Sequence, residues 1–235
     1  MFFAYNEGSQ GAKVVLQLFK DYQGAIQTDG YAGYNILKKL EGITTLGCWV
    51  HTRRYFDRAL SHDKARAEYA LAQIGMLYDV EGMADDQHMD TLQRMELRKR
   101  LAYPIIRAFE KWCICEQGNV LPKSPIGKAI GYFLNNSRQL VRYTMDGRYL
   151  PDTNLIENSV RPVAIGRKNY LFCGNHDAAE DAAVIYSLMG CCKAADVDFK
   201  QWMNYFLNHV HEYDSDYSKD LVNLLPHSLK KQGII

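Results

Sequence analysis

The sequence lacks the features that mark membrane-spanning, secreted and disulfide-rich proteins. No apolar run approaches the roughly 18–20 residues that a helix needs to cross a bilayer, so we expect no membrane segment. The amino terminus has no basic region, no sustained apolar stretch and no cleavage site, so no signal peptide is predicted. Only six cysteines are present, and their scatter argues against a disulfide scaffold and for a reducing, cytoplasmic environment.

What the chain does contain is typical of a globular protein. Its 235 residues are 47% hydrophobic and 23% charged, enough to bury the core of one large domain or two small ones. The formal net charge of +1 excludes a uniformly basic nucleic-acid coat but permits a local basic face. Residues 138–172 carry a net charge of +3 and residues 194–220 one of −4, so a basic middle precedes an acidic end.

Hydrophobic spacing predicts an α/β protein with a long helical interruption. Residues 2–5, 25–30 and 43–50 are predicted as short strands, with a helix between the first two. From Thr52 the spacing becomes helical and stays so to about residue 137, with a kink expected at Pro104.

These elements divide the chain into four predicted parts. Residues 1–51 would form the first part of a core, and residues 52–137 an all-helical insertion into it. Residues 138–192 would complete the core, and residues 193–235 would form a helical carboxyl-terminal element. Within the insertion, the excess of Lys and Arg over Glu in residues 91–112 is most simply explained by a solvated helix face.

Asp29 is the first candidate for chemistry. It ends an apolar predicted strand and is followed by Gly30. The carboxyl ends of strands are where α/β proteins place their ligands. An Asp-Gly pair is also a common turn, and from this fragment alone the turn is the favoured interpretation.

Glu157 is the second candidate. It lies three residues after Asn154 in PDTNLIENSVRP, so a capping box explains it without any catalysis. However, Arg161 follows on the same helical face, and the cationic and aromatic run GRKNYLF comes next. Taken with Asp29, a carboxylate among cations suggests a Mg²⁺ site that handles phosphates, because Mg²⁺ prefers oxygen ligands and keeps positions open for substrate.

Cys48 and His51 form a C-x-x-H pair. A structural zinc site needs four ligands, and no second pair has matching spacing, so zinc is not favoured. The preferred interpretation is a His that forms a hydrogen bond near a strand end and helps to shape the edge of the site. Other cysteines in apolar helical stretches are most simply small buried residues: Cys113, Cys115, Cys191 and Cys192.

Several blocks of sequence together carry a family resemblance. They are QTDGYAGYN (27–35), GCWVHTRRYF (47–56), KSPIGKA (123–129) and DTNLIENSVRPVAIGRKNYLFCGN (152–175). In this order, over nearly the whole chain, they resemble transposases of the insertion sequence 66 family. The closing VNLLPHSLK also resembles the short carboxyl-terminal element of that family.

The resemblance implies a fold, an activity and a cofactor. The family is understood to have a ribonuclease H-like core with an Asp, Asp, Glu (DDE) triad and two Mg²⁺ ions, which cleaves and joins DNA strands. Motif by motif, Asp29 matches the second Asp of the triad and Glu157 matches the Glu. Both are therefore expected to be catalytic and metal-binding residues.

The same resemblance implies that DNA is the partner, at the transposon ends and at the target. The expected DNA contacts, which would position phosphates without reading sequence, are Arg161, Arg167, Lys168, His51 and Arg53. Self-association or accessory transposition proteins are expected as further partners, and no membrane. The expected location is the bacterial cytoplasm, in association with the nucleoid.

One departure from the family pattern concerns the first Asp of the triad. In the family it lies on the first core strand, upstream of a hairpin whose last strand residues 2–5 resemble. Only Met1 precedes them here, and Asp21 lies in the wrong place to replace it. We therefore expect an incomplete ribonuclease H-like core that is inactive on its own. The alternative is a non-catalytic DNA-binding or regulatory protein derived from a transposase, which would bind DNA in a salt-sensitive way without cleaving it.

Overall fold

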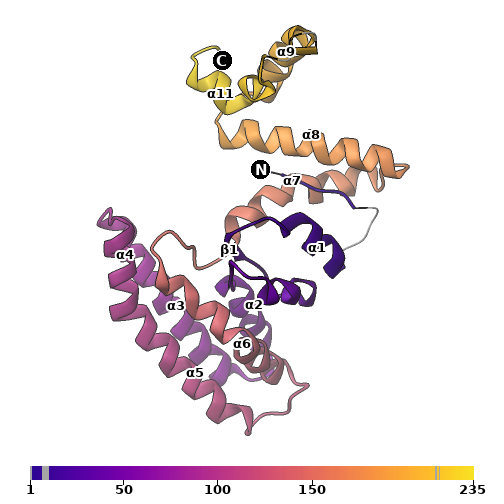
Figure 1. Cartoon of the computed structure of the whole chain (residues 1–235). Helices are drawn as coiled ribbons and strands as arrows, with labels where there is room; N and C mark the ends of the chain where they lie inside the picture. The colour runs from indigo at the N-terminus through magenta and orange to yellow at the C-terminus, as the bar shows by residue number, and fades with distance from the viewer. Residues whose placement is uncertain (1, 7–10, 215, 217) are drawn as a thin grey trace. The chain divides into compact units, whose positions relative to one another are not determined.

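A computed structural model describes residues 2–6, 11–214, 216 and 218–235. The chain forms two compact units, both drawn in Figure 1. The central unit comprises Gln10–Asn154, and the terminal unit combines Met1–Ser9 with Leu155–Ile235. The boundary falls at the start of helix α7 (Asn154–Tyr170), so this helix begins in the central unit and continues in the terminal one.

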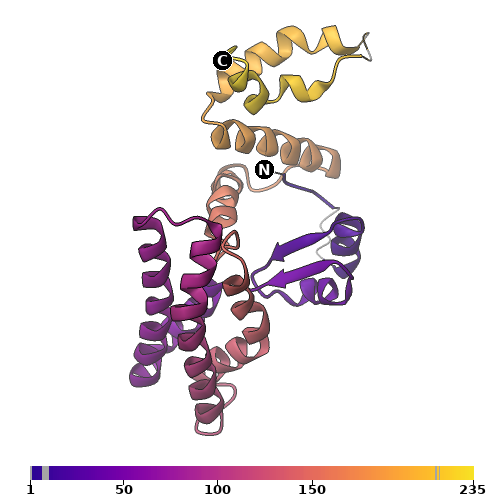
Figure 2. The same ribbon diagram turned by 60° about the vertical axis from the view of Figure 1, so that its left-hand side comes forward.

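The central unit opens with a small α/β layer. Strands β1 (Gly24–Gln27) and β2 (Ile43–Leu46) pair in parallel. Helix α1 (Ala12–Phe19) precedes β1, and the 3-10 helix η1 (Ala32–Lys39) connects the two strands, as Figure 2 shows. Because the strands are parallel, the residues that follow them emerge at one common edge of the sheet.

Both strands are shorter than the sequence predicts. The strand predicted over 25–30 ends at Gln27, and Gly30 adopts a positive φ of 82° that turns the chain away. The strand predicted over 43–50 ends at Leu46, because a helix begins at Trp49. An α/β arrangement of strongly helical character is observed, whereas the ribonuclease H-like core stays a prediction.

Residues 2–5, predicted as a strand, pair with no strand in the described part of the chain. Within the terminal unit they contact helix α8 (His176–Ala194) instead. The Phe3 amide donates to Ser187 Oγ at 2.8 Å, and the Tyr5 hydroxyl lies 2.6 Å from His176 Nδ1. The strand prediction is therefore wrong: the Phe3 amide bonds to the side chain of a helix residue and not to the backbone of a neighbouring strand.

A helical layer forms the rest of the central unit. Its elements are α2 (Trp49–Ala59), α3 (Lys64–Asp86), α4 (Thr91–Leu97), the π-helical turn η2 (Arg98–Ala102), α5 (Tyr103–Gln117), α6 (Pro125–Val141) and the 3-10 helix η3 (Arg142–Met145). Side-chain caps at Asp63, Asp90 and Ser124 begin α3, α4 and α6. These helices span the residues whose spacing predicted them, while their role as an insertion into a core stays a prediction.

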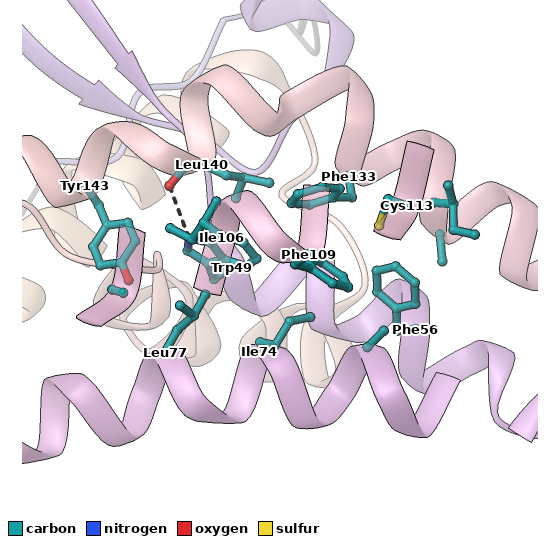
Figure 3. Packing of buried hydrophobic residues seen from close by; sticks show 14 of the residues in the cluster. Trp49, Phe56, Ile74, Leu77, Ile106, Phe109, Cys113, Phe133, Leu140 and Tyr143 are labelled. Carbon is teal, nitrogen blue, oxygen red and sulfur yellow. Dashed lines mark hydrogen bonds between the residues drawn. The ribbon is translucent and has the colours of Figure 1, made fainter. Parts of the chain in front are cut away.

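The core of the central unit lies between these helices (Figure 3). The Phe109 ring packs against Phe133 with centroids 4.6 Å apart and against Phe56 at 5.7 Å. The indole N–H of Trp49 donates to the Leu140 carbonyl at 3.2 Å, which ties the start of α2 to the end of α6. Buried aromatic rings thus hold together α2, α5 and α6.

The kink predicted at Pro104 takes the form of a π-helical turn. Proline has no N–H, and its ring clashes with the carbonyl four residues earlier in a regular helix. Immediately before it, the Tyr103 amide donates to the Arg98 carbonyl, five residues back, which closes the wider turn of η2. The helix continues beyond this point with one extra residue in the turn.

Arg98 does not belong to a solvated helix face. Its guanidinium is buried and makes two hydrogen bonds to Glu81 of α3, at 2.8 and 2.6 Å. It also donates to the carbonyls of Tyr143 and Asp146, at 3.0 and 2.8 Å. The prediction of a solvated face is therefore wrong at this position, because Arg98 links α3 and η2 to the segment that follows α6.

The terminal unit is helical throughout its described elements. Besides α7 and α8, these are α9 (Phe199–His209), α10 (His211–Asp214), the 3-10 helix η4 (Leu221–Leu224) and α11 (Pro226–Lys231). Its core contains Cys192, Trp202 and Leu229, and the Trp202 indole donates to the Leu224 carbonyl at 2.8 Å. Across the described residues of both units, no helix has the length and apolar character to cross a membrane.

Candidate functional site

Asp29 lies two residues beyond the end of β1, at the carboxyl edge of the sheet. Its side chain is exposed, and Oδ1 accepts a hydrogen bond from the Tyr31 amide at 2.9 Å, which is the predicted turn. Oδ2 accepts no hydrogen bond from any residue that the structure describes. The Tyr132 hydroxyl of α6 donates to the Asp29 carbonyl at 2.6 Å, so a side chain from the helical layer fixes the backbone here. Asp29 therefore serves the turn and still offers one carboxylate oxygen to solvent.

Cys48 follows the neighbouring strand and directly precedes α2. His51 Nδ1 lies 3.2 Å from its sulfur, so His51 forms a hydrogen bond near a strand end, as predicted. The Thr153 amide and hydroxyl also donate to this sulfur, at 3.4 and 3.2 Å. Burial on its own would raise the pKa of the Cys48 thiol, but the hydrogen bonds from His51 and Thr153 outweigh it and hold that pKa below its ordinary value.

The segment that leads into α7 is attached to the same edge of the sheet. Gln27 Nε2, at the end of β1, donates to the carbonyls of Gly47 and Leu150 at 3.0 and 2.8 Å. The Trp49 amide donates to the Pro151 carbonyl at 3.0 Å. Together with the contact between Thr153 and Cys48, these bonds join the ends of both strands to the residues immediately before α7.

Asp152 completes this attachment two residues before the helix begins. Its Oδ2 accepts a hydrogen bond from the Tyr78 hydroxyl of α3 at 2.9 Å, and its Oδ1 accepts from the Asn154 amide at 2.9 Å. Burial and the Asp152 carboxylate both raise the pKa of Tyr78, so its hydroxyl stays a donor. The Asn154 amide therefore bonds to Asp152, and the capping box between Asn154 and Glu157 stays a prediction.

Glu157 lies in the first turn of α7 and is half-buried. An acidic residue at this end of a helix interacts favourably with the helix dipole. Arg161 and Lys168 fall on the same face of the helix as Glu157, by their spacing of four and eleven residues. Glu157 belongs to the terminal unit and Asp29 to the central unit, so the close approach of the two carboxylates stays a prediction.

The predicted DNA contacts are all accessible or partly accessible. Arg161, Arg167 and Lys168 are exposed along α7, and Arg53 is exposed on α2. Arg167 and Lys168 lie in the last turn of α7, where cations also stabilise the helix end. Their exposure is compatible with phosphate binding, which stays a prediction.

The donor chemistry of the two acids suits a hard cation, because Mg²⁺ prefers carboxylate oxygens. In the part of the chain that the structure describes, however, no three His, Cys, Asp or Glu side chains form a cluster that could hold a metal ion. Asp29 and Glu157 alone would form an incomplete set of ligands.

Sequence reasoning missed the residues that attach the α7 segment. No structural role was predicted for Gln27, Tyr78 or Thr153, and each acts through a partner more than 70 positions away in the sequence. Only Asp152, just ahead of Asn154, carried a local signal, because Asp is a common helix-capping residue.

Comparison with known proteins decides the family. A family model described as "Transposase IS66 family" matches residues 1–181. The chain belongs to this transposase family. Among curated proteins of Sinorhizobium fredii (strain NBRC 101917 / NGR234), the uncharacterized protein y4qI is 32% identical over 213 residues, which cover 87% of this chain and 39% of the relative.

Two further relatives from the same strain agree. The uncharacterized protein y4jD is 26% identical over 96% of this IS66-family chain and 45% of its own length, and y4hP is 26% identical over 82% and 38%. The chain therefore spans about two fifths of the length of the curated relatives it matches. No solved structure matches it.

Proposed function

We propose that this chain is the part of a DDE-type transposase core that carries the second Asp and the Glu of the triad, Asp29 and Glu157. The substrate is DNA, at the transposon ends and at the target. The reaction is phosphoryl transfer, in which Mg²⁺, when bound, activates a water or a DNA 3′-hydroxyl and stabilises the leaving oxygen. The first Asp of the triad would complete the set of ligands.

The observation that carries the proposal is the attachment of the α7 segment to the strand edge. Asp29 follows β1, and Cys48 follows β2 at the same edge. Thr153 bonds to Cys48, and Asn154 begins α7 one residue later. Glu157 is only three residues further along that helix, a rise of about 4.5 Å. Chain continuity from an anchored residue thus favours a shared site for the two acids.

Each residue then has a defined role. Asp29 and Glu157 would supply carboxylate oxygens to Mg²⁺, with Asp29 held in place by Tyr31 and Tyr132. Arg161 and Lys168, on the Glu157 face of α7, would bind the phosphates of the strand to be cut and so position it. The cations neutralise the repulsion between the DNA and the two carboxylates.

The test measures the binding of Mn²⁺, a paramagnetic substitute for Mg²⁺. Binding is detected as the broadening of nearby backbone amide resonances in NMR spectra. We expect Mn²⁺ to broaden the resonances around Asp29 and Glu157 at the same concentration. Asp29→Asn and Glu157→Gln should each weaken this binding by at least about tenfold at both places. The matched control is Asp21→Asn, whose side chain is 87% exposed in the same unit and which should change nothing.

Two outcomes would contradict the proposal. If each substitution removed broadening only around its own position, the two acids would not share a site. If the chain with Mg²⁺ nicked supercoiled plasmid DNA and kept this activity in both Asp29→Asn and Glu157→Gln, the two acids would not be catalytic. Salt-sensitive DNA binding without Mn²⁺ binding would favour the non-catalytic, regulatory alternative.

A further inference from the structure

A groove of about 400 Å³ lies on the central unit between α2, α6 and the segment that joins α5 to α6. This volume falls within the range of small-ligand sites, about 300–1,000 Å³. By contrast, the cavity beside Gly30 and Cys48 at the strand edge measures only about 10 Å³, the size of one water molecule. The groove is thus large enough to admit part of a ligand, whereas the cavity at the strand edge is not.

Two stacked tyrosines line the groove and connect it to the candidate site. The rings of Tyr55 and Tyr132 lie 4.3 Å apart between centroids and are inclined by only 19°. The Tyr132 hydroxyl donates to the Asp29 carbonyl at 2.6 Å, so one wall of the groove touches the backbone of the proposed metal ligand. Burial raises the pKa of Tyr132, which keeps this hydroxyl protonated.

The polar groups of the groove suit an anionic ligand with hydrogen-bonding edges. Lys128 is exposed and forms no ion pair with a described residue. The side-chain amides of Gln117 and Asn135 likewise form no hydrogen bond within the described chain. The residues lining the groove include no Asp or Glu. One cation, two amides and two aromatic rings are therefore available to a ligand.

Gly131 gives independent evidence that the groove is open space. It lies inside α6, where glycine is about 1 kcal/mol less favourable than alanine. A Cβ atom added there would meet no atom within 4 Å, so packing does not require the glycine. At Gly127, one turn earlier, the same Cβ would approach the Leu121 carbonyl to 2.1 Å, and packing does require it. A side chain at position 131 would occupy the groove.

We propose that this groove binds an unpaired nucleotide of a DNA strand. The base would lie against the pair formed by Tyr55 and Tyr132, its edge would bond to Gln117 and Asn135, and its phosphate would meet Lys128. Aromatic stacking beside a cation is the general way in which proteins hold single strands without reading their sequence. This inference deepens the proposed function, on which it rests for the nature of the substrate, and adds an unpaired strand segment next to Asp29.

The test measures the affinity of the full chain for a fluorescent oligothymidylate and for a duplex of equal length, by anisotropy. Gly131→Leu should weaken single-strand binding by about tenfold or more, the value of one base stack. Gly75→Leu is the matched control, because Gly75 also lies inside a helix, α3, with no atom within 4 Å of an added Cβ. It should leave binding unchanged, and neither variant should lower the unfolding temperature.

Lys128→Ala gives a second measurement that does not depend on the helix interior. It should weaken single-strand binding and lower its salt slope by about one unit. Competition by thymidine monophosphate distinguishes a DNA strand from a free nucleotide as the ligand. If the monophosphate displaces the oligonucleotide only at far higher concentrations, the ligand is a strand; if it does so at the oligonucleotide's own concentration, the inference is overturned. Parent-like single-strand binding by both Gly131→Leu and Lys128→Ala, or equal losses for single strand and duplex, would also overturn the inference.

The Mn²⁺ experiment separates the two proposals. If Gly131→Leu loses single-strand binding but keeps the broadening around Asp29, the groove acts independently of the metal site, as we expect. If the chain binds no Mn²⁺ and Gly131→Leu still loses single-strand binding, the metal site is wrong and the groove stands.

Discussion

Replacing Arg98 by methionine tests whether the buried ion pair supports the segment before α7. The Arg98 side chain is 1% exposed and that of Glu81 is 10% exposed. Removing one partner of a buried pair costs about 3–5 kcal/mol, because the other charge stays buried. In Arg98→Met, Glu81 keeps one bond to Arg94 at 3.0 Å, so we expect the lower end, about 3 kcal/mol. The carbonyls of Tyr143 and Asp146 also lose their donor.

The assay is native-state hydrogen exchange of the full chain, read from the amides of α3 and α5, since this reports the unfolding free energy of the central unit alone. Arg107→Met is the control: its side chain is 60% exposed, and its ion pair with Glu110 should be worth less than about 1 kcal/mol. The double variant Arg98→Met/Glu81→Met should lose less than the sum of the single variants. A loss below about 1 kcal/mol for Arg98→Met, or simple additivity, would refute this reasoning.

Two further predictions concern DNA binding and pH. Changing Arg167 and Lys168 to alanine should weaken binding to unrelated DNA sequences equally and lower the salt slope by about one to two units; an unchanged slope would contradict their assignment. Hydrogen bonds from Arg148 hold the pKa of Asp146 at about 2, below its ordinary 3.8, so its contribution to stability is complete above about pH 4 and is lost as the pH falls through about 2. Arg148→Ala should raise the NMR titration midpoint of Asp146 towards 3.8, and an unmoved midpoint would exclude this cause.

Much of the helical structure could be predicted from sequence, because amphipathic spacing is a local signal. The helices from α3 to α6 lie where spacing placed them, and Pro104 marked the irregular turn correctly. The strand at residues 2–5 could not be predicted reliably, since four apolar residues fit an extended segment on a helix equally well. Arg98 looked like a surface residue because its partner, Glu81, is recruited by tertiary structure from another helix.

The candidate site divides in the same way. The position of Asp29 just after a strand and a hydrogen bond of His51 near a strand end followed from local sequence, although the partner of His51, Cys48, was not predicted. The bond from the Asn154 amide to Asp152 did not, because Asp and Asn both commonly accept such bonds near a helix start and only the fold decides which one does.

The bond between Cys48 and Thr153 explains why a sulfur atom lies at the strand edge. Three hydrogen-bonding atoms surround the Cys48 sulfur: His51 Nδ1 at 3.2 Å, the Thr153 hydroxyl at 3.2 Å and the Thr153 amide at 3.4 Å. A serine oxygen has optimal hydrogen-bond distances of about 2.7–3.0 Å, so it could not serve all three at these separations without moving the backbone. The larger thiol therefore joins His51, the start of α2 and the residue before α7 at one point. Because Thr153 directly precedes α7, this contact would also help to position the start of the helix that carries the proposed Glu157.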